Sequence, residues 1–227
     1  GAECCLQRNC SADAQAIQVL DQGVGKLHPG QRRRMGLHFV PEERLGRGAV
    51  PSMSLAHNLL LTRTEALGRG GWIRMGALRQ QAASIIERYR VKAGGPQASA
   101  RSLSGGNLQK FIMGREIDAR PRLLIVSQPT WGVDVGAAAQ IRGALLALRD
   151  AGCAVLVVSE ELDELFEISD RLYVIARGRL SPSLARSHAN VALIGEWMSG
   201  LWHSKVQSHL QALEGATPSA GAHHAAA

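Results

Sequence analysis

The sequence contains no apolar run long enough to cross a bilayer. Its longest aliphatic stretch runs from Cys153 to Val158 and has the length of a β-strand, whereas a membrane-spanning helix needs about 18 residues. The first ten residues show no basic region followed by an apolar block, so they do not predict a secretion signal. These absences favour a cytoplasmic chain.

Cysteine and aromatic residues are scarce. The four cysteines, Cys4, Cys5, Cys10 and Cys153, are too few in 227 residues to form the framework of a small disulfide-rich domain. We therefore expect reduced thiols. Three of them lie in the first ten residues without a nearby histidine, which leaves a zinc site there short of its fourth ligand. Three Phe and two Tyr also offer few stacking platforms for single-stranded nucleic acid.

Basic residues outnumber acidic residues in this sequence. The 26 Lys and Arg against 19 Asp and Glu give a formal charge of +7, which suits a polyanion such as nucleic acid or an anionic membrane surface. Apart from Arg32 to Arg34, however, the arginines are dispersed along the sequence. We therefore expect the basicity to be mostly solvated surface. A hydrophobic fraction of 45% predicts a folded globular chain.

Short apolar segments alternate with amphipathic helical segments in the second half of the chain. The predicted strands are 123–126, 154–158 and 172–175, and the predicted helices cover about 136–150 and the residues around 162–166. Fully apolar strands in this alternation indicate a parallel sheet covered on both faces. Upstream, 35–40 predicts a buried strand that stops at Pro41. Helical patterns follow at about 52–100, ended by the Gly-Gly-Pro at 94–96, and from near Asn107.

The segment Leu103 to Lys110, LSGGNLQK, carries the most chemical information. Two glycines let a backbone approach a phosphate, the Ser104 hydroxyl can donate to it, and the following helix offers free N–H groups and its positive dipole end. The segment can therefore seat an anion. The structural alternative is an ordinary capped helix start after a glycine turn.

This segment resembles the signature motif of ABC-type ATPases. About 15 residues later, RLLIVSQPTWGVDVGA resembles the Walker B strand and D-loop of that family, and SEELDELFEISDRLYVIARGRL resembles its switch region. The PEERLGRG loop and the ending IGEWMSGL are similar to the second nucleotide-binding half of the tandem ATPases that power simple-sugar and nucleoside importers. The resemblance runs from about Arg33 to Leu201.

The resemblance implies an α/β fold of the ABC-type P-loop ATPase class, with a parallel-sheet core, an inserted α-helical subdomain and a phosphate-loop region that is missing or altered. It also implies a division of the chain. Residues 1–31 stay unassigned, 32–51 form a core strand and Q-loop-like region, 52–120 the helical subdomain with the signature motif, 121–201 the α/β core with Walker B-like, D-loop and switch regions, and 202–227 a low-complexity tail.

The phosphate loop of P-loop ATPases ends in Gly-Lys followed by Ser or Thr, in which Lys reaches the β and γ phosphates and the hydroxyl binds Mg²⁺. No such segment occurs in this sequence. The nearest is Gly25-Lys26, but Leu27 follows it and Leu20 stands where the loop needs glycine. We interpret Gly25-Lys26 as a plain turn. Most of the residues that would bind the nucleotide's phosphates are therefore not found in this sequence.

The catalytic positions implied by the resemblance are degenerate. Where the family has an Asp for Mg²⁺ and a Glu that activates water, this sequence has Ser127 and Gln128, and a carboxamide cannot accept the proton. Glu160 stands at the switch position usually held by His, and Glu42 at the Q-loop position. As structure, Glu160 opens a helix and Glu42 pairs with Arg44 in a loop. No hydrolysis is expected from this chain alone.

An intact signature beside a degenerate hydrolytic site is explained by the paired action of ABC domains, in which each nucleotide lies between the phosphate loop of one half and the signature of the other. The resemblance implies that Ser104, Gly105, Gly106 and Asn107 contact ATP held mainly, with Mg²⁺, by a partner half. Asp134 would lie at the same interface in the D-loop. Trp131 beside it suits a partner contact as well as packing within the domain.

The sequence thus predicts the second, catalytically degenerate half of an importer's ATP-binding subunit, at the cytoplasmic face of the inner membrane. Its expected partners are a first ABC half of the same or a second chain, transmembrane permease subunits and, indirectly, a solute-binding protein. The segment Ser-Gln-Pro-Thr resembles the nucleoside branch of the family, which implies a slight preference for nucleosides over sugars. The alternatives are an ABC-like scaffold that binds nucleic acid, which the dispersed arginines disfavour, and a truncated product without function.

Overall fold

The structure is a computed structural model that describes residues 17–63, 68–69 and 72–202. The chain divides into two compact units, Gly1–Glu164 and Leu165–Ala227. None of the described helices is both long and apolar enough to span a bilayer. Cys4, Cys5 and Cys10 lie outside the described residues, and Cys153 is a buried free thiol.

The first unit is built around a parallel sheet of three strands, β3 (Leu37–Val40), β6 (Leu123–Ser127) and β7 (Ala154–Val158), in the order β3-β6-β7. Val40 is in register with Val126, and Ser127 with Val158. The carboxyl ends of the three strands therefore meet at one edge. The predicted strands 35–40, 123–126 and 154–158 are confirmed to within two residues.

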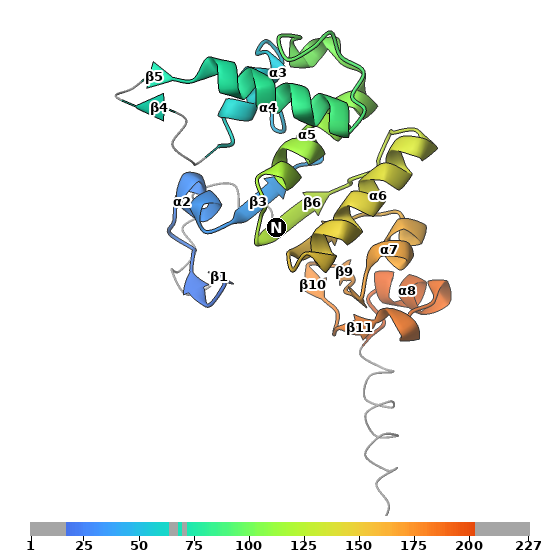
Figure 1. Cartoon of the computed structure of the whole chain (residues 1–227). Helices are drawn as coiled ribbons and strands as arrows, with labels where there is room; N and C mark the ends of the chain where they lie inside the picture. The colour runs from blue at the N-terminus through green and yellow to red at the C-terminus, as the bar shows by residue number, and fades with distance from the viewer. Residues whose placement is uncertain (1–16, 64–67, 70–71, 203–227) are drawn as a thin grey trace, which may run out of the picture. The chain divides into compact units, whose positions relative to one another are not determined.

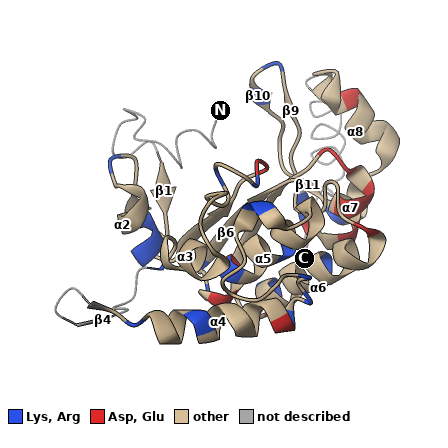
Figure 2. Cartoon of the chain, turned by 90° about the horizontal axis from the view of Figure 1, so that it is seen from above, with Lys and Arg blue, Asp and Glu red and all other residues tan. Residues whose placement is uncertain are grey.

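Helices cover this sheet and connect its strands (Figure 1). α5 (Gly105–Asp118) packs on β3, α6 (Val135–Asp150) packs on β7, and the two helices contact each other. Phe111 and Ile112 of α5 and Ile141 of α6 are buried, as the helical periodicity predicts. The short helix α2 (Pro29–Arg34) leads directly into β3 and carries three arginines, which are blue in Figure 2.

A helical layer lies against α5, because α4 (Met75–Arg88) packs on both α3 (Leu55–Leu60) and α5. Two details differ from the sequence prediction. A small hairpin, β4 (Gly68–Arg69) with β5 (Trp72–Ile73), interrupts the helical stretch. The α4 helix also ends before the glycines at 94–95, because Arg90 takes a left-handed backbone conformation (φ 48°) that the helix cannot continue through.

β7 is less covered than the sequence pattern predicts. It pairs with β6, and no strand within the described ranges pairs with its other edge. Leu156 is 48% exposed and Val158 is 37% exposed, whereas β6 is buried from Leu124 to Ser127. Coverage of both faces therefore holds for β6 and largely for β3, but not for β7.

The second unit contains short antiparallel pairs rather than the predicted strand 172–175. β8 (Arg171–Leu172) pairs with β11 (Leu184–Ala185), and β9 (Ile175–Ala176) pairs with β10 (Arg179–Leu180). Between β8 and β9, the N–H of Val174 donates to the hydroxyl of Ser181, so the chain changes partner there. The helices α7 (Leu162–Ile168), which crosses the unit boundary, and α8 (Val191–Met198) complete the described residues, with a 3₁₀ turn η2 (Arg186–His188).

Candidate functional site

Ser104 occupies the N-cap position of α5, and its side chain makes no capping bond. Instead, the Ser104 hydroxyl accepts a hydrogen bond of 2.8 Å from the amide of Asn107. The amide oxygen of Asn107 in turn accepts from the backbone N–H of Lys92 at 2.8 Å. The alternative of an ordinary side-chain cap is therefore wrong here, and the first-turn N–H groups receive no bond from the Ser104 side chain.

The helix α5 starts two residues earlier than the sequence pattern predicts, because Gly105 and Gly106 belong to the helix. A Cβ at Gly105 would lie 2.7 Å from a guanidinium nitrogen of Arg44, so glycine is required for that contact. Gly106 lies against Val133, at 3.7 Å from the position that its Cβ would take. The helix start is thus packed between two loops, with Ser104 and Gly105 exposed.

Arg44 joins three segments that are far apart in the sequence. Its Nε donates to the side chain of Gln109 at 3.2 Å, and its guanidinium also donates to the carbonyl of Trp131. The guanidinium carbon lies 5.8 Å from the centre of the Trp131 ring. Burial lowers the pKa of Arg44 from its ordinary value. The sequence analysis assigned Arg44 to an ion pair with Glu42 and missed these partners, because Gln109 and Trp131 are distant in the sequence.

The expected Glu42–Arg44 ion pair does not form. Arg44 turns to Gln109 and Trp131, and the ion pair in this loop joins Arg47 to Glu43 at 2.9 Å. Glu42 is exposed and makes no ion pair or side-chain hydrogen bond within the described part of the chain. Glu42 follows the last residue of β3 by two positions, so it lies in the loop at the carboxyl edge of the sheet.

Three positions that the resemblance implies to be degenerate lie together at the carboxyl edge of the sheet: Ser127, Gln128 and Glu160. Ser127 ends β6 and is buried, while Gln128 has a left-handed backbone (φ 48°) and donates its N–H to the carbonyl of Val158. The Gln128 carboxamide oxygen lies 3.4 Å from the N–H of Glu160. Ser159, between them, donates to the carboxylate of Glu164 at 2.9 Å. The neutral carboxamide of Gln128 thus lies where the loops after β6 and β7 begin.

Gln109 ties this edge to α5. It is buried, and its amide donates to the carbonyl of Pro129 at 3.0 Å while its oxygen accepts from Arg44. Asp134 caps α6 by accepting from the N–H of Ala137 at 2.8 Å. That hydrogen bond, helped by the nearby charge of Lys110, lowers the pKa of Asp134. The structure therefore gives Asp134 a structural role in addition to the interface role expected from the sequence.

The arrangement can present an exposed hydroxyl and helix N–H groups to an anion, while the neighbouring strand ends offer no carboxylate at Ser127 or Gln128. The described residues contain no cluster of three or more side chains suited to a metal ion. Trp131 is 59% exposed beside Arg44, so a broad aromatic face remains available at this site.

Comparison with curated proteins finds relatives that share more than a third of their aligned residues with this chain. The nucleoside import ATP-binding protein NupA of Lactococcus lactis is 39% identical over 170 residues, or 74% of this chain and 34% of that protein. The guanosine import ATP-binding protein NupO of Bacillus subtilis is 36% identical over 190 residues, or 83% and 37%. The ribose import ATP-binding protein RbsA 1 of Rubrobacter xylanophilus is 36% identical over 179 residues, or 78% and 36%. This chain therefore spans about a third of the length of these relatives.

Solved structures of ATP-binding cassettes are similar in fold to this chain, at lower sequence identity. A dimeric ATP-binding cassette in a post-hydrolysis state with ADP and Pi matches with a TM-score of 0.60 at 16% identity, covering 74% of this chain and 72% of that one. The ATP-binding subunit of an ABC transporter matches with a TM-score of 0.61 at 16% identity, covering 88% and 76%. These likenesses show a shared fold. A scan against models of known protein families finds no match.

Proposed function

Because the chain belongs to the ABC ATP-binding proteins of the sugar and nucleoside importer type, we propose that it is a nucleotide-binding half that completes the ATP site of a partner. The observation that carries the proposal is the exposed Ser104 hydroxyl at an uncapped helix start, at a site where Ser127 and Gln128 replace acids. Such a helix start favours a negatively charged group through its N–H groups and dipole.

In this proposal the signature residues Ser104, Gly105, Gly106 and Asn107 contact the phosphates of ATP that is held, with Mg²⁺, mainly by the partner half. Asn107 positions the Ser104 hydroxyl, because the hydrogen bond of 2.8 Å joins the two side chains. Arg44 and Gln109 position the helix start by tying it to the loops behind β3 and β6. The exposed Asp134 and Trp131 would face the partner.

The chain's own sheet edge is proposed to be inactive in hydrolysis. Gln128 cannot accept a proton from water, and loss of a positioned base removes about 10²- to 10⁴-fold in rate. Glu160, at the end of the neighbouring strand, would repel a γ-phosphate when ionised. We expect the surrounding assembly to contain permease subunits and a solute-binding protein, with this subunit peripheral at the cytoplasmic face of the membrane. Nucleosides remain the favoured solute class over simple sugars.

ATPase measurements test the proposal. The purified chain alone should show no Mg²⁺-dependent turnover, and it should stimulate a purified cassette half that carries an intact phosphate loop. Ser104→Ala should reduce the stimulation about tenfold or more, since a donor to developing phosphate charge is lost. Ser102→Ala is the matched control, because the Ser102 hydroxyl donates to the carbonyl of Ser99 and not to the site. Turnover by the chain alone that survives Ser104→Ala would contradict the proposal.

A further inference from the structure

A second candidate site lies at the opposite end of the parallel strands. A pocket of about 440 Å³ is lined by residues that precede β3 and β6, among them Gly36 and Arg122. Ser127 and Gln128 stand at the other end of β6, so this pocket is separate from the proposed nucleotide site. A pocket of this size suits a small molecule.

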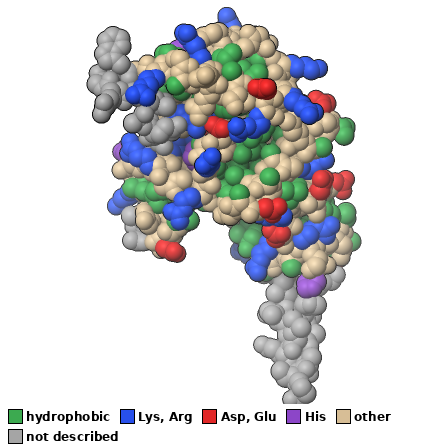
Figure 3. Space-filling model, viewed as in Figure 1, with side chains coloured by type: hydrophobic (Ala, Val, Ile, Leu, Met, Phe, Trp, Pro, Cys, Tyr) green, Lys and Arg blue, Asp and Glu red, His purple; other side chains and the backbone are tan. Residues whose placement is uncertain are grey.

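The lining of the pocket is strongly basic. Four arginines and a histidine line it: Arg33, Arg34, Arg120, Arg122 and His38. None of the described lining residues is acidic. On the face shown in Figure 3, Lys and Arg side chains gather around α2. The sequence had shown these arginines as a short run and two dispersed residues. The fold brings them together because α2 and the segment between α5 and β6 both end at the amino-terminal edge of the sheet.

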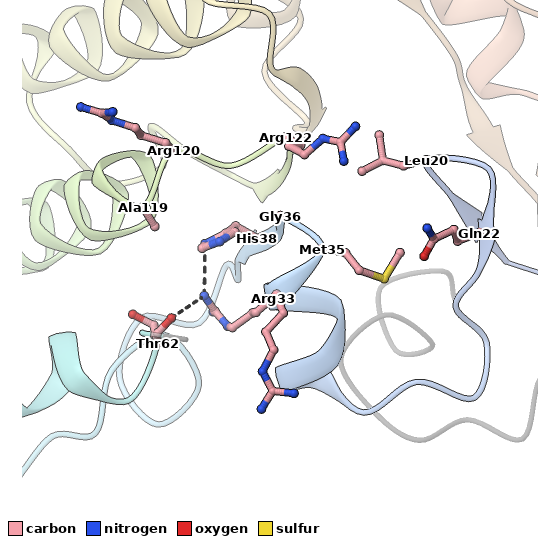
Figure 4. A pocket seen from close by; sticks show the side chains of 11 residues that line it. Leu20, Gln22, Arg33, Met35, Gly36, His38, Thr62, Ala119, Arg120 and Arg122 are labelled. Carbon is pink, nitrogen blue, oxygen red and sulfur yellow. Dashed lines mark hydrogen bonds between the residues drawn. The ribbon is translucent and has the colours of Figure 1, made fainter. Parts of the chain in front are cut away.

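The basic residues of the pocket differ in whether their side chains have a partner within the protein. Arg33 donates to the buried carboxylate of Glu116 at 2.7 Å and to the carbonyl of Thr62 at 3.4 Å, and it lies 3.2 Å from His38 (Figure 4). Arg34, Arg120 and Arg122 are exposed, and their side chains make no hydrogen bond or ion pair within the described ranges of the chain. Three guanidinium groups are therefore available to a ligand.

Two backbone features place Arg120 and Arg122 at the rim. Arg120 follows the end of α5 in a left-handed conformation (φ 51°) that costs about 1–2 kcal/mol for a residue with a Cβ, and glycine is the usual choice there. Gly36 (φ 91°) makes room for the stem of Arg122, because a Cβ on Gly36 would lie 2.9 Å from Cγ of Arg122. In Figure 4, Arg120 and Arg122 extend in different directions, and Arg122 points toward Leu20.

We propose that this pocket binds a small phosphate-type oxyanion with several negative charges, such as the diphosphate group. The guanidinium fork matches two phosphate oxygens at once, and an anion offsets the mutual repulsion of neighbouring arginines. Exposed arginine side chains are free to rotate onto such a ligand. Asp21 is the acidic residue between the lining residues Leu20 and Gln22 in the sequence, and it does not itself line the pocket. The proposal does not depend on the function of the signature segment.

Calorimetric titration of the full chain with pyrophosphate tests this inference. At 50 mM salt the dissociation constant should be below about 1 mM and should rise with salt. Arg120→Gly together with Arg122→Gln should weaken binding about tenfold or more. These changes keep the fold, since glycine suits the backbone of Arg120 and glutamine keeps most of the stem that packs on Gly36. Arg74→Gln together with Arg79→Gln removes the same two positive charges at exposed positions at and near the start of α4, and this double variant is the matched control.

Three outcomes overturn the proposal. The first is no pyrophosphate binding at 10 mM ligand (about ten times the expected constant), and the second is equal weakening by the control variant with Arg74→Gln and Arg79→Gln. The third is loss of binding in Ser104→Ala, which would move the ligand to the signature segment. Sedimentation with vesicles containing phosphatidic acid distinguishes the source of the phosphate. Co-sedimentation that pyrophosphate competes away assigns the site to a lipid phosphate, and calorimetric binding without co-sedimentation assigns it to a free one.

Discussion

Gly114 and Tyr89 pack so closely that a Cβ on Gly114 would lie 2.5 Å from Cδ2 of the tyrosine ring. Ile85 of α4 would lie 2.9 Å from the same Cβ. Glycine in the middle of α5 therefore sets how closely α4 approaches the helix that carries the signature segment at its start.

Gly114→Ala should destabilise the chain by about 1–2 kcal/mol. Overpacking costs about 1–3 kcal/mol, which exceeds the gain of up to about 1 kcal/mol that alanine brings to a helix. Gly143→Ala in α6 is the matched control, since nothing lies within 4 Å of its Cβ position and the substitution should stabilise. Urea unfolding measures both. Equal stabilisation by the two substitutions would show that the packing around Tyr89 adapts.

Glu116→Gln should cost about 3–5 kcal/mol, because the buried carboxylate pairs with Arg33 at 2.7 Å and with Arg115 at 2.8 Å. Asp150→Asn, which breaks an exposed ion pair with Arg149, should cost less than about 1 kcal/mol. Chemical unfolding at neutral pH compares the two. Similar losses would contradict the assigned importance of the buried pair.

The decrease in the free energy of unfolding at acidic pH should also depend on Glu116. Burial raises the pKa of this carboxyl, but Arg115, the hydrogen bond with His38 and Arg33 together lower it well below its ordinary value of 4.5. A lowered folded-state pKa means that the stabilisation is complete above pH 4.5 and is lost as the pH falls below it. Unfolding free energy measured from pH 6 to pH 3 (about one unit or more on either side of that value) should therefore fall more steeply in the wild type than in Glu116→Gln.

Arg44→Gln should destabilise the chain by about 1.5–3 kcal/mol, since hydrogen bonds from the charged guanidinium to Gln109 and Trp131 are lost. It should also lower the stimulation of a partner's ATPase, because the start of α5 is no longer held. Arg47→Gln removes an exposed ion pair in the same loop and should change neither quantity appreciably. Unaltered stimulation in a folded Arg44→Gln would remove Arg44 from the positioning role.

Leu156→Lys should reduce self-association of the chain. β7 is apolar throughout and pairs on one edge within the described residues, and such edges template contact with other strands. Val191→Lys changes an even more exposed apolar residue (60% against 48% for Leu156), which lies on the helix α8 and not on a strand edge, and it should have a smaller effect. Sedimentation velocity over a concentration series compares them. Equal effects would attribute the association to exposed hydrophobicity alone.

The sequence alone determined the parallel strands and the helices whose signals are local. β6 and β7 contain four and five consecutive apolar residues, and β3 is apolar apart from His38. These runs, and the 3.6-residue spacing of Leu78, Ala82 and Ile85, are set by burial along a single element. The helix α5 was also predicted, with its start placed two residues too late, near Asn107. The hypothesis that Ser127 and Gln128 stand in place of two acids needs no structure, since it rests on residue identity and on the family resemblance.

Only the tertiary structure decided which long-range partners these residues take. Arg44 lies 65 residues from Gln109 and 87 from Trp131, and no local pattern distinguishes that choice from an ion pair with Glu42. The exposed edge of β7 and the strand change between β8 and β9 depend on which strands are present to pair. The arginines of α2 and of the segment before β6 meet in one pocket because the sheet aligns the starts of its strands, and sequence spacing carries no record of that alignment.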